Sequence, residues 1–187
     1  MIAQLSMSRA VSQQELMARR ILGLACVVFI TLFVVPVTLG SDLNLQIRPL
    51  TAIDKRYMAD QRKTVEDFAN RLGRRLSGAP DRDLDTLQII ADRRWIDPGD
   101  IKTQQALGVV FGDLLAAELD FHWVVYSDDT GRSRALQYKQ EALFIFPVTM
   151  LSRRLTAEAP LAVQELFDEQ VTKQRLTLPG AKWMPLQ

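Results

Sequence analysis

Residues 106–147 read ALGVVFGDLLAAELDFHWVVYSDDTGRSRALQYKQEALFIFP, and the rest of the chain after residue 45 can be arranged around them. Up to about Leu119 the apolar residues of this stretch surround the helix axis almost completely, which predicts a helix buried in the domain centre. Residues 122–127 are rich in β-branched and aromatic side chains and predict a strand with two partly covered faces. Residues 128–131 supply turn residues, so we expect the chain to return as a second strand over 132–138.

Three helical patterns lead up to or into this stretch. Thr51 and Asp54 have the spacing of a capping box, and a long helix is expected to follow them to about residue 76. A second helix over residues 84–95 has Asp83 as its expected cap. The central helix itself is expected to begin near residue 101 and to end near Leu119.

The chain after the hairpin completes the fold prediction. Residues 141–146 are apolar and predict a third strand, while Pro147 and Pro160 each suit the first position of a following helix. Consecutive strands on short connections pair as an antiparallel meander. We therefore predict an α+β domain over residues 51–178, a three-stranded antiparallel meander packed with about five helices, followed by an irregular tail over 179–187.

The N-terminal part contains an uncharged apolar run that begins at Ile21 and ends at Gly40. A helix of this length spans roughly 30 Å, the hydrocarbon thickness of a bilayer. The run is longer than the apolar part of a secretory signal, and its cleavage motif is weak, so we expect an uncleaved signal anchor rather than a cleaved signal. Arg19 and Arg20 precede it, and the positive-inside rule then predicts a cytoplasmic tail (1–20), a transmembrane helix (21–40), a linker (41–50) and a periplasmic domain. The predicted localisation is the inner membrane, crossed once.

Composition excludes several classes of function. The chain has 187 residues and a net charge of +1, and its first 40 residues hold three arginines and one glutamate. The remainder is therefore near neutral, with 20 basic and 21 acidic residues, and lacks the basic footprint of non-specific nucleic-acid binding. One cysteine, Cys26, and one histidine, His122, exclude an intrachain disulfide and a multi-histidine metal site. We expect no nucleic acid, no metal and no cofactor.

Asp113 is the strongest candidate for chemistry, because it is a carboxylate on an otherwise apolar helix. A buried carboxylate is costly unless it is hydrogen-bonded, and such groups cluster at catalytic sites. Glu118 and His122 would approach each other across the helix-to-strand turn and, with Asp113, would form a minimal acid–base set. The alternative is that Asp113 accepts bonds from backbone amides or faces solvent. Because no activated nucleophile or phosphate-binding loop accompanies the three residues, we favour structural roles for them.

Two further features are structural or binding candidates. Gly108 and Gly112 lie one turn apart and would let a neighbouring backbone approach, despite a helix cost of about 1 kcal/mol each. Arg132 and Arg134 alternate along their strand, so both project from one sheet face. With the arginine pairs at 93–94 and 153–154 they would form an anion-binding surface. The alternative is that these arginines form ordinary salt bridges, to Asp92, Glu141 or Glu158.

Three motifs carry a resemblance to a known family. LGVVFGD, WVVYSDD-x-GRSRAL and FPVTMLSRRL resemble a domain family of unknown function found in small proteobacterial proteins, over roughly residues 60–170. The family has no established activity to carry over, so the resemblance implies a domain boundary rather than a function.

Three hypotheses for function follow. The first is a membrane-anchored, non-enzymatic interaction module that binds a protein partner in a process of the cell envelope. The second is an enzyme that uses Asp113, Glu118 and His122. The third is a membrane-anchored immunity-type protein that blocks a toxin.

Overall fold

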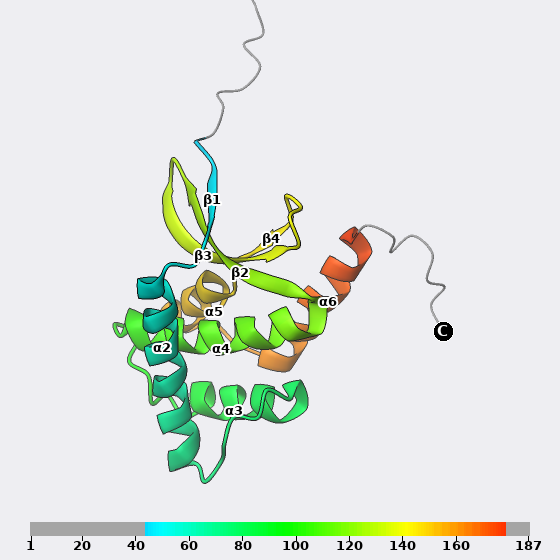
Figure 1. Ribbon diagram of the computed structural model, residues 1–187. Coiled ribbons are helices and arrows are strands. Elements are labelled where there is room, and N and C mark those ends of the chain that lie inside the picture. Colours follow the sequence, from blue (N-terminus) through cyan, green and yellow to red (C-terminus); the bar gives the residue numbers. More distant parts are fainter. Residues whose placement is uncertain (1–43, 179–187) are drawn as a thin grey trace, which may run out of the picture. The chain divides into compact units, whose positions relative to one another are not determined.

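The structure is a computed structural model that describes residues 44–178, and this part of the chain forms four strands and five helices (Figure 1). Along the chain these are β1 (Gln46–Pro49), α2 (Ala52–Arg71), α3 (Pro80–Asp92), α4 (Ile101–Leu119), β2 (Phe121–Asp128), β3 (Gly131–Tyr138), β4 (Phe144–Ile145), α5 (Pro147–Thr156) and α6 (Val163–Thr177). The fold is α+β, as the sequence predicts, with all strands in one antiparallel sheet of order β1-β2-β3-β4.

The sheet has four strands, so the prediction of a three-stranded meander is wrong. The additional strand, β1, lies within the segment that the sequence assigns to a linker, and it pairs with β2 so that Gln46 faces Ser127 and Pro49 faces Val124. All four residues of β1 are exposed, which explains why no hydrophobic pattern marks the strand. A proline is tolerated there because β1 is an edge strand, where an N–H can be missing.

The predicted architecture with a transmembrane helix also needs correction. Within residues 44–178 no helix combines the length and the apolar character that crossing a bilayer requires. The predicted span from Ile21 to Gly40 lies outside the described residues, as does the irregular tail over 179–187. The finding goes against the expected fold class, and we do not retain the single-pass inner-membrane localisation or the periplasmic placement of the domain.

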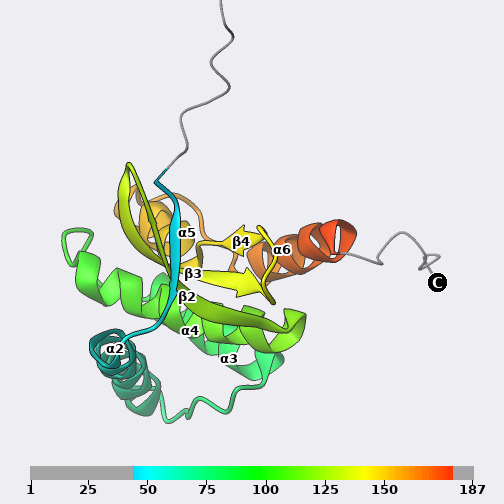
Figure 2. The same ribbon diagram turned by 45° about the horizontal axis from the view of Figure 1, so that its top comes forward.

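One face of the sheet carries the helices. Trp123 of β2 donates a hydrogen bond to α4, and the Arg134 guanidinium of β3 lies over the Tyr57 ring of α2. Side chains alternate along a strand, so Val124 and Tyr126 point to the opposite face. Figures 1 and 2 show the helices gathered on one side of the strands, with the hairpin of β2 and β3 projecting away from them.

Helix α4 lies at the centre of the core, as predicted from the apolar residues that surround its axis. Phe111 is fully buried and meets the Phe167 ring of α6 edge-on, with 6.0 Å between the ring centroids. The predicted close approach of a neighbouring backbone is confirmed for Gly108, because a Cβ there would lie 2.6 Å from the backbone of Val148, in α5; at Gly112 the close neighbours are side chains. A Cβ on Gly112 would overlap the indole ring of Trp123.

Several predicted helix ends shift for local reasons. The capping box of α2 is present, but the helix ends at Arg71 rather than near residue 76, and Gly73 follows with a φ of +69°. The helix α3 begins at Pro80, so Asp83 lies inside its first turn and is not its cap. The buried Asp83 carboxylate instead accepts bonds from the backbone N–H groups of Ser77, at 3.0 Å, and Gly78, at 2.7 Å.

The connections after the hairpin are longer than expected. The strand β4 has only two residues, and the segment before it turns back with the Leu143 carbonyl accepting from the Tyr138 N–H at 3.1 Å. The helix α6 begins at Val163 rather than at Pro160. The Gln88 side chain of α3 holds this start, because its oxygen accepts from the Val163 N–H at 2.7 Å.

Candidate functional site

Asp113 is held by three hydrogen bonds from side chains. Arg62 of α2 donates from Nε at 2.6 Å and from Nη2 at 2.8 Å, and Trp123 of β2 donates from Nε1 at 2.9 Å. Neither backbone amides nor solvent alone therefore satisfies this carboxylate. Asp113 also lines a mostly apolar cavity of about 430 Å³, together with Val110 and Leu114. The contacts tie α2, α4 and the sheet together.

The acid–base set suggested by the sequence is not assembled. Glu118 forms an ion pair with Arg175 of α6. His122 is exposed and precedes Trp123 in β2, so its side chain points to the sheet face opposite to the one that meets Asp113. The structure thus places the three predicted residues in three separate environments.

Arg132 and Arg134 converge on a buried carboxylate. Asp54 is 1% exposed, and it accepts from Arg132 Nη2 at 2.7 Å and pairs with Arg134 Nη2 at 3.0 Å. Thr51 adds a hydroxyl bond of 2.7 Å. Burial raises the pKa of Asp54, but the bonds from Thr51 and Arg132 outweigh it and hold the pKa at about 2, below the ordinary 3.8. The expected acidic partners for this pair, such as Glu141, are replaced by Asp54.

Arg134 continues this cluster into α4. Its guanidinium carbon lies 4.2 Å from the centroid of the Tyr57 ring, and the Tyr57 hydroxyl donates to Gln105 at 3.1 Å. Arg134 Nε is buried without a hydrogen-bond partner in the part of the chain that the structure describes. These contacts connect the hairpin to two helices inside the domain, and both arginines are already paired with Asp54.

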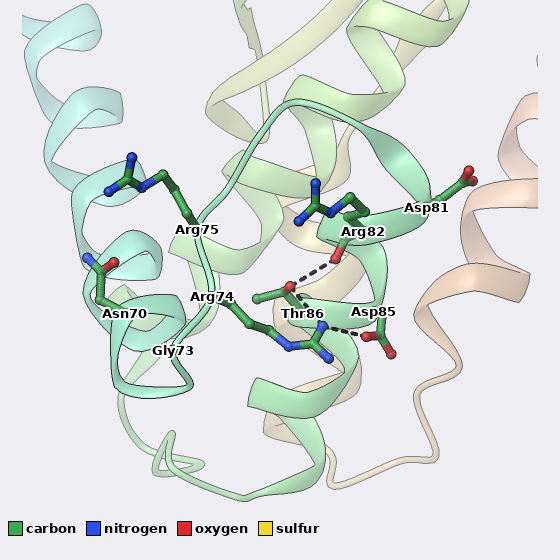
Figure 3. Close-up of a pocket in the computed structure, with 8 residues that line it drawn as sticks. All are labelled: Asn70, Gly73, Arg74, Arg75, Asp81, Arg82, Asp85 and Thr86. Atoms are coloured by element: carbon green, nitrogen blue, oxygen red, sulfur yellow. Dashed lines mark hydrogen bonds and ion pairs between the residues drawn. The ribbon is translucent and has the colours of Figure 1, made fainter.

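A larger hollow lies between α2 and α3, where three arginines gather (Figure 3). It encloses about 710 Å³. Arg74 forms an ion pair with Asp85 and donates to Thr86 at 3.3 Å, while Asp81 on the same wall points away. One carboxylate, Asp85, therefore offsets part of the positive charge of this hollow.

A second hollow, which we name the α5–α6 groove, lies where β4, α5 and α6 meet. It encloses about 360 Å³ and is lined by Phe144, Ile145, Phe146, Thr149, Met150, Arg153, Arg154, Gln170, Lys173 and Gln174. No carboxylate lines it, and among residues 44–178 none of its three cations forms an ion pair. Arg154 donates to the Met150 carbonyl at 2.9 Å.

Aromatic rings form the wall of the groove on the sheet side. Phe144 and Phe146 each meet the Tyr126 ring edge-on, with centroid separations of 5.1 Å, and all three side chains are partly exposed. On the α6 side Gln170 is 7% exposed and Gln174 is 5% exposed. The groove thus combines aromatic carbon, buried amides and unpaired positive charge.

The arginine pair at 153–154, which lines the groove, was identified from the sequence, whereas Lys173, Gln170 and Gln174 were not. A signal for the glutamines exists, because Gln170 and Gln174 continue the buried stripe of α6 begun by Val163 and Phe167. Polar residues inside an apolar stripe are expensive unless they have partners. Among residues 44–178 no group of three or more His, Cys, Asp or Glu side chains is placed to hold a metal ion.

Comparison with known proteins concerns the family and the fold. Curated proteins give no significant match. The crystal structure of a protein from Bacteroides thetaiotaomicron VPI-5482, at 1.50 Å resolution, has a TM-score of 0.62 at 18% identity and covers 69% of this chain. The match covers 48% of that protein, so this chain corresponds to about half of its length, and the likeness shows the fold alone.

Residues 83–167, from α3 into α6, match the family model described as a domain of unknown function, DUF3806. The match confirms the resemblance to a domain family of unknown function, while the proteobacterial distribution of that family stays a prediction. The ion-pair cluster around Asp54 includes residues both outside and inside this range. Residues 83–167 are therefore similar to the DUF3806 domain, whose function is unknown.

Proposed function

We propose that residues 44–178 form a binding domain for a protein partner, without a catalytic role, and that the partner docks in the α5–α6 groove. The observation that carries this proposal is a contrast in how the charged side chains are used. Two of the three side chains that the sequence offers for chemistry, Asp113 and Glu118, are engaged in ion pairs between elements. Those around the groove, Arg153 and Lys173 among them, have no such partner within residues 44–178.

The engaged residues argue against an enzyme built on Asp113, Glu118 and His122. A general acid or base must reach a substrate atom within hydrogen-bond distance, and cooperating groups must face the same space. The Asp113 carboxylate already accepts three bonds, and His122 projects from the other face of the sheet. Of the three side chains, Asp113 lines one of the hollows described above, and Glu118 and His122 line none of them.

The composition of the groove is typical of a protein interface. Aromatic side chains, methionine and arginine are enriched at the centre of such interfaces, where they supply buried area and directed hydrogen bonds. Phe144, Phe146 and Met150 provide the apolar part, and Arg153 provides an exposed guanidinium. A docked partner would bury the partly exposed rings and would supply opposite charge to the cations.

Site-specific photo-crosslinking in the native cell tests the proposal. A photoreactive phenylalanine analogue at Thr149 or Lys173 should yield one discrete protein adduct, identified by mass spectrometry. The matched control places the same group at exposed Asp67 of α2, where no discrete adduct is expected. Equal adducts from all three positions would contradict docking in the groove. Complementation of a deletion strain tests whether these residues are catalytic. A variant with Glu118→Gln and His122→Gln should restore function. Failure of this variant to restore function, despite normal folding, would favour an enzyme.

A further inference from the structure

We infer that the α5–α6 groove binds an extended, acidic peptide segment of its protein partner, an inference that rests on the proposed function. Three properties of the groove support it independently: its charge, an amide that no residue among 44–178 engages, and a sheet edge that no strand of the described chain covers. Each selects a different feature of the bound chain.

The charge of the groove selects an acidic segment. Arg153 and Arg154 of α5 and Lys173 of α6 all line the groove, and no aspartate or glutamate does. The described part of the chain is otherwise close to neutral, so this cluster of positive charge is local rather than a property of the whole surface. Cations that surround a hollow of low polarity attract an opposite charge and speed its encounter with the site.

The amide of Gln170 selects a peptide main chain. Its side chain is 7% exposed and lines the groove, and no residue among 44–178 forms a hydrogen bond with it. Its amide atoms are not sealed from solvent, so they are accessible to a bound chain. A glutamine amide both donates and accepts, and a peptide unit offers the matching carbonyl and N–H together. A bound main chain would therefore satisfy both halves of this group.

The sheet edge favours an extended conformation. The strand β4 pairs with β3 on one side only, and within residues 44–178 no strand pairs with its other side. A peptide that adds a strand to such an edge gains main-chain bonds, while its alternate side chains enter neighbouring pockets. Phe144 and Phe146 lie beside this edge and would contact an apolar side chain.

Fluorescence anisotropy with the full chain tests the inference. The probe is a short fluorescein-labelled peptide in which glutamate alternates with valine, and the matched probe has lysine in place of each glutamate. We expect binding of the acidic probe only. A variant with Arg153→Glu and Lys173→Glu should bind the acidic probe about tenfold or more weakly and should acquire binding of the lysine probe. The control variant Arg75→Glu makes the same kind of charge change in the α2–α3 hollow and should leave both affinities unchanged.

The variant Gln170→Leu tests the contribution of the amide to binding separately from that of the charges. It keeps a side chain of similar size and removes the amide that would bond the main chain of the peptide. We therefore expect it to weaken binding of the acidic probe several-fold while leaving the free energy of unfolding nearly unchanged. A fall in that free energy without loss of binding would make Gln170 structural and would overturn its assignment.

Three other outcomes overturn the inference. An equal loss of binding in the Arg75→Glu variant would show that the acidic probe responds to the net charge of the protein rather than to a defined site. Tighter binding of a single-stranded oligodeoxynucleotide than of the acidic probe would assign the groove to phosphate backbones. Absence of any peptide binding, alongside a discrete photo-crosslink at Lys173, would refute the acidic segment and leave the proposed function standing.

Discussion

At Asp113, three hydrogen bonds from Arg62 and Trp123 converge on one carboxylate, which is about one-third exposed. Asp113→Ala removes all three bonds and leaves the Arg62 guanidinium without its partner. Partial exposure reduces the loss, and we expect the free energy of unfolding to fall by about 1–2 kcal/mol. Urea denaturation measures it, with exposed Asp60→Ala of α2 as the control. A change as small as that of the control would show that the ion pair contributes nothing.

Asp54 makes stability depend on pH in a defined window. Its folded pKa of about 2 lies below the ordinary 3.8, so the folded state prefers the ionised carboxylate. The stabilisation is complete above about pH 5 and is lost as the pH falls through 4 towards 2. The difference corresponds to about 2 kcal/mol at neutral pH.

The variant Asp54→Asn tests this linkage. It should lose about 2 kcal/mol at pH 7 and should show a flatter dependence of the free energy of unfolding on pH below 4 than the parent chain. Urea denaturation at a series of pH values gives both quantities. A variant curve that stays parallel to the parent curve down to pH 2 would show that Asp54 does not carry the acid sensitivity.

At the scale of elements, the contact between α4 and α5 depends on a missing side chain. A Cβ at position 108 would lie 2.6 Å from Val148 Cα and 2.9 Å from its carbonyl oxygen, and backbone cannot move aside as a flexible side chain can. Alanine is the better helix former by about 1 kcal/mol, but the overlap should prevail and Gly108→Ala should destabilise by about 1–3 kcal/mol. Thermal or urea denaturation measures this, with exposed Ala117→Ser on the same helix as the control. A stabilised Gly108→Ala would disprove the close approach.

The edge strand β1 covers β2, and its removal has a predictable effect. Its residues Arg48 and Pro49 pair with Val125 and Val124, and charged or proline residues at an edge discourage further pairing. A chain that begins at residue 51 would expose the apolar β2 as the new edge. We expect it to self-associate in sedimentation velocity, whereas a chain that begins at residue 44 stays as the parent does. Identical sedimentation of the two truncated chains would contradict this role of β1.

The parts of the fold that were predictable are those whose pattern is local. The circumference of α4, the turn at 128–131 and the capping box of α2 each depend on neighbouring residues, and all three are present. The strand β1 was missed because its residues are exposed and its only support is a distant partner, β2. Asp113 was identified as unusual, but its partner Arg62 lies 51 positions away, and no spacing rule links the two.

The candidate site was less predictable than the fold, for the same reason. The groove joins α5 to α6, so Arg153 and Lys173 become neighbours only through the packing of both helices. From the sequence, Arg132 and Arg134 were candidates for binding, but in the structure both form ion pairs with Asp54. Whether a charged residue is free or engaged depends on its tertiary partner, which the sequence alone does not specify.

For the whole molecule, we propose that the domain binds an acidic peptide segment of its partner in the α5–α6 groove. Hydrogen–deuterium exchange of the full chain, with and without the acidic peptide, tests this most directly because it maps binding onto every element at once. We expect slower exchange over residues 144–154 and 170–174 and unchanged exchange around Asp113 and in the α2–α3 hollow. Slower exchange confined to the surroundings of Asp113, or no change in the groove, would contradict it.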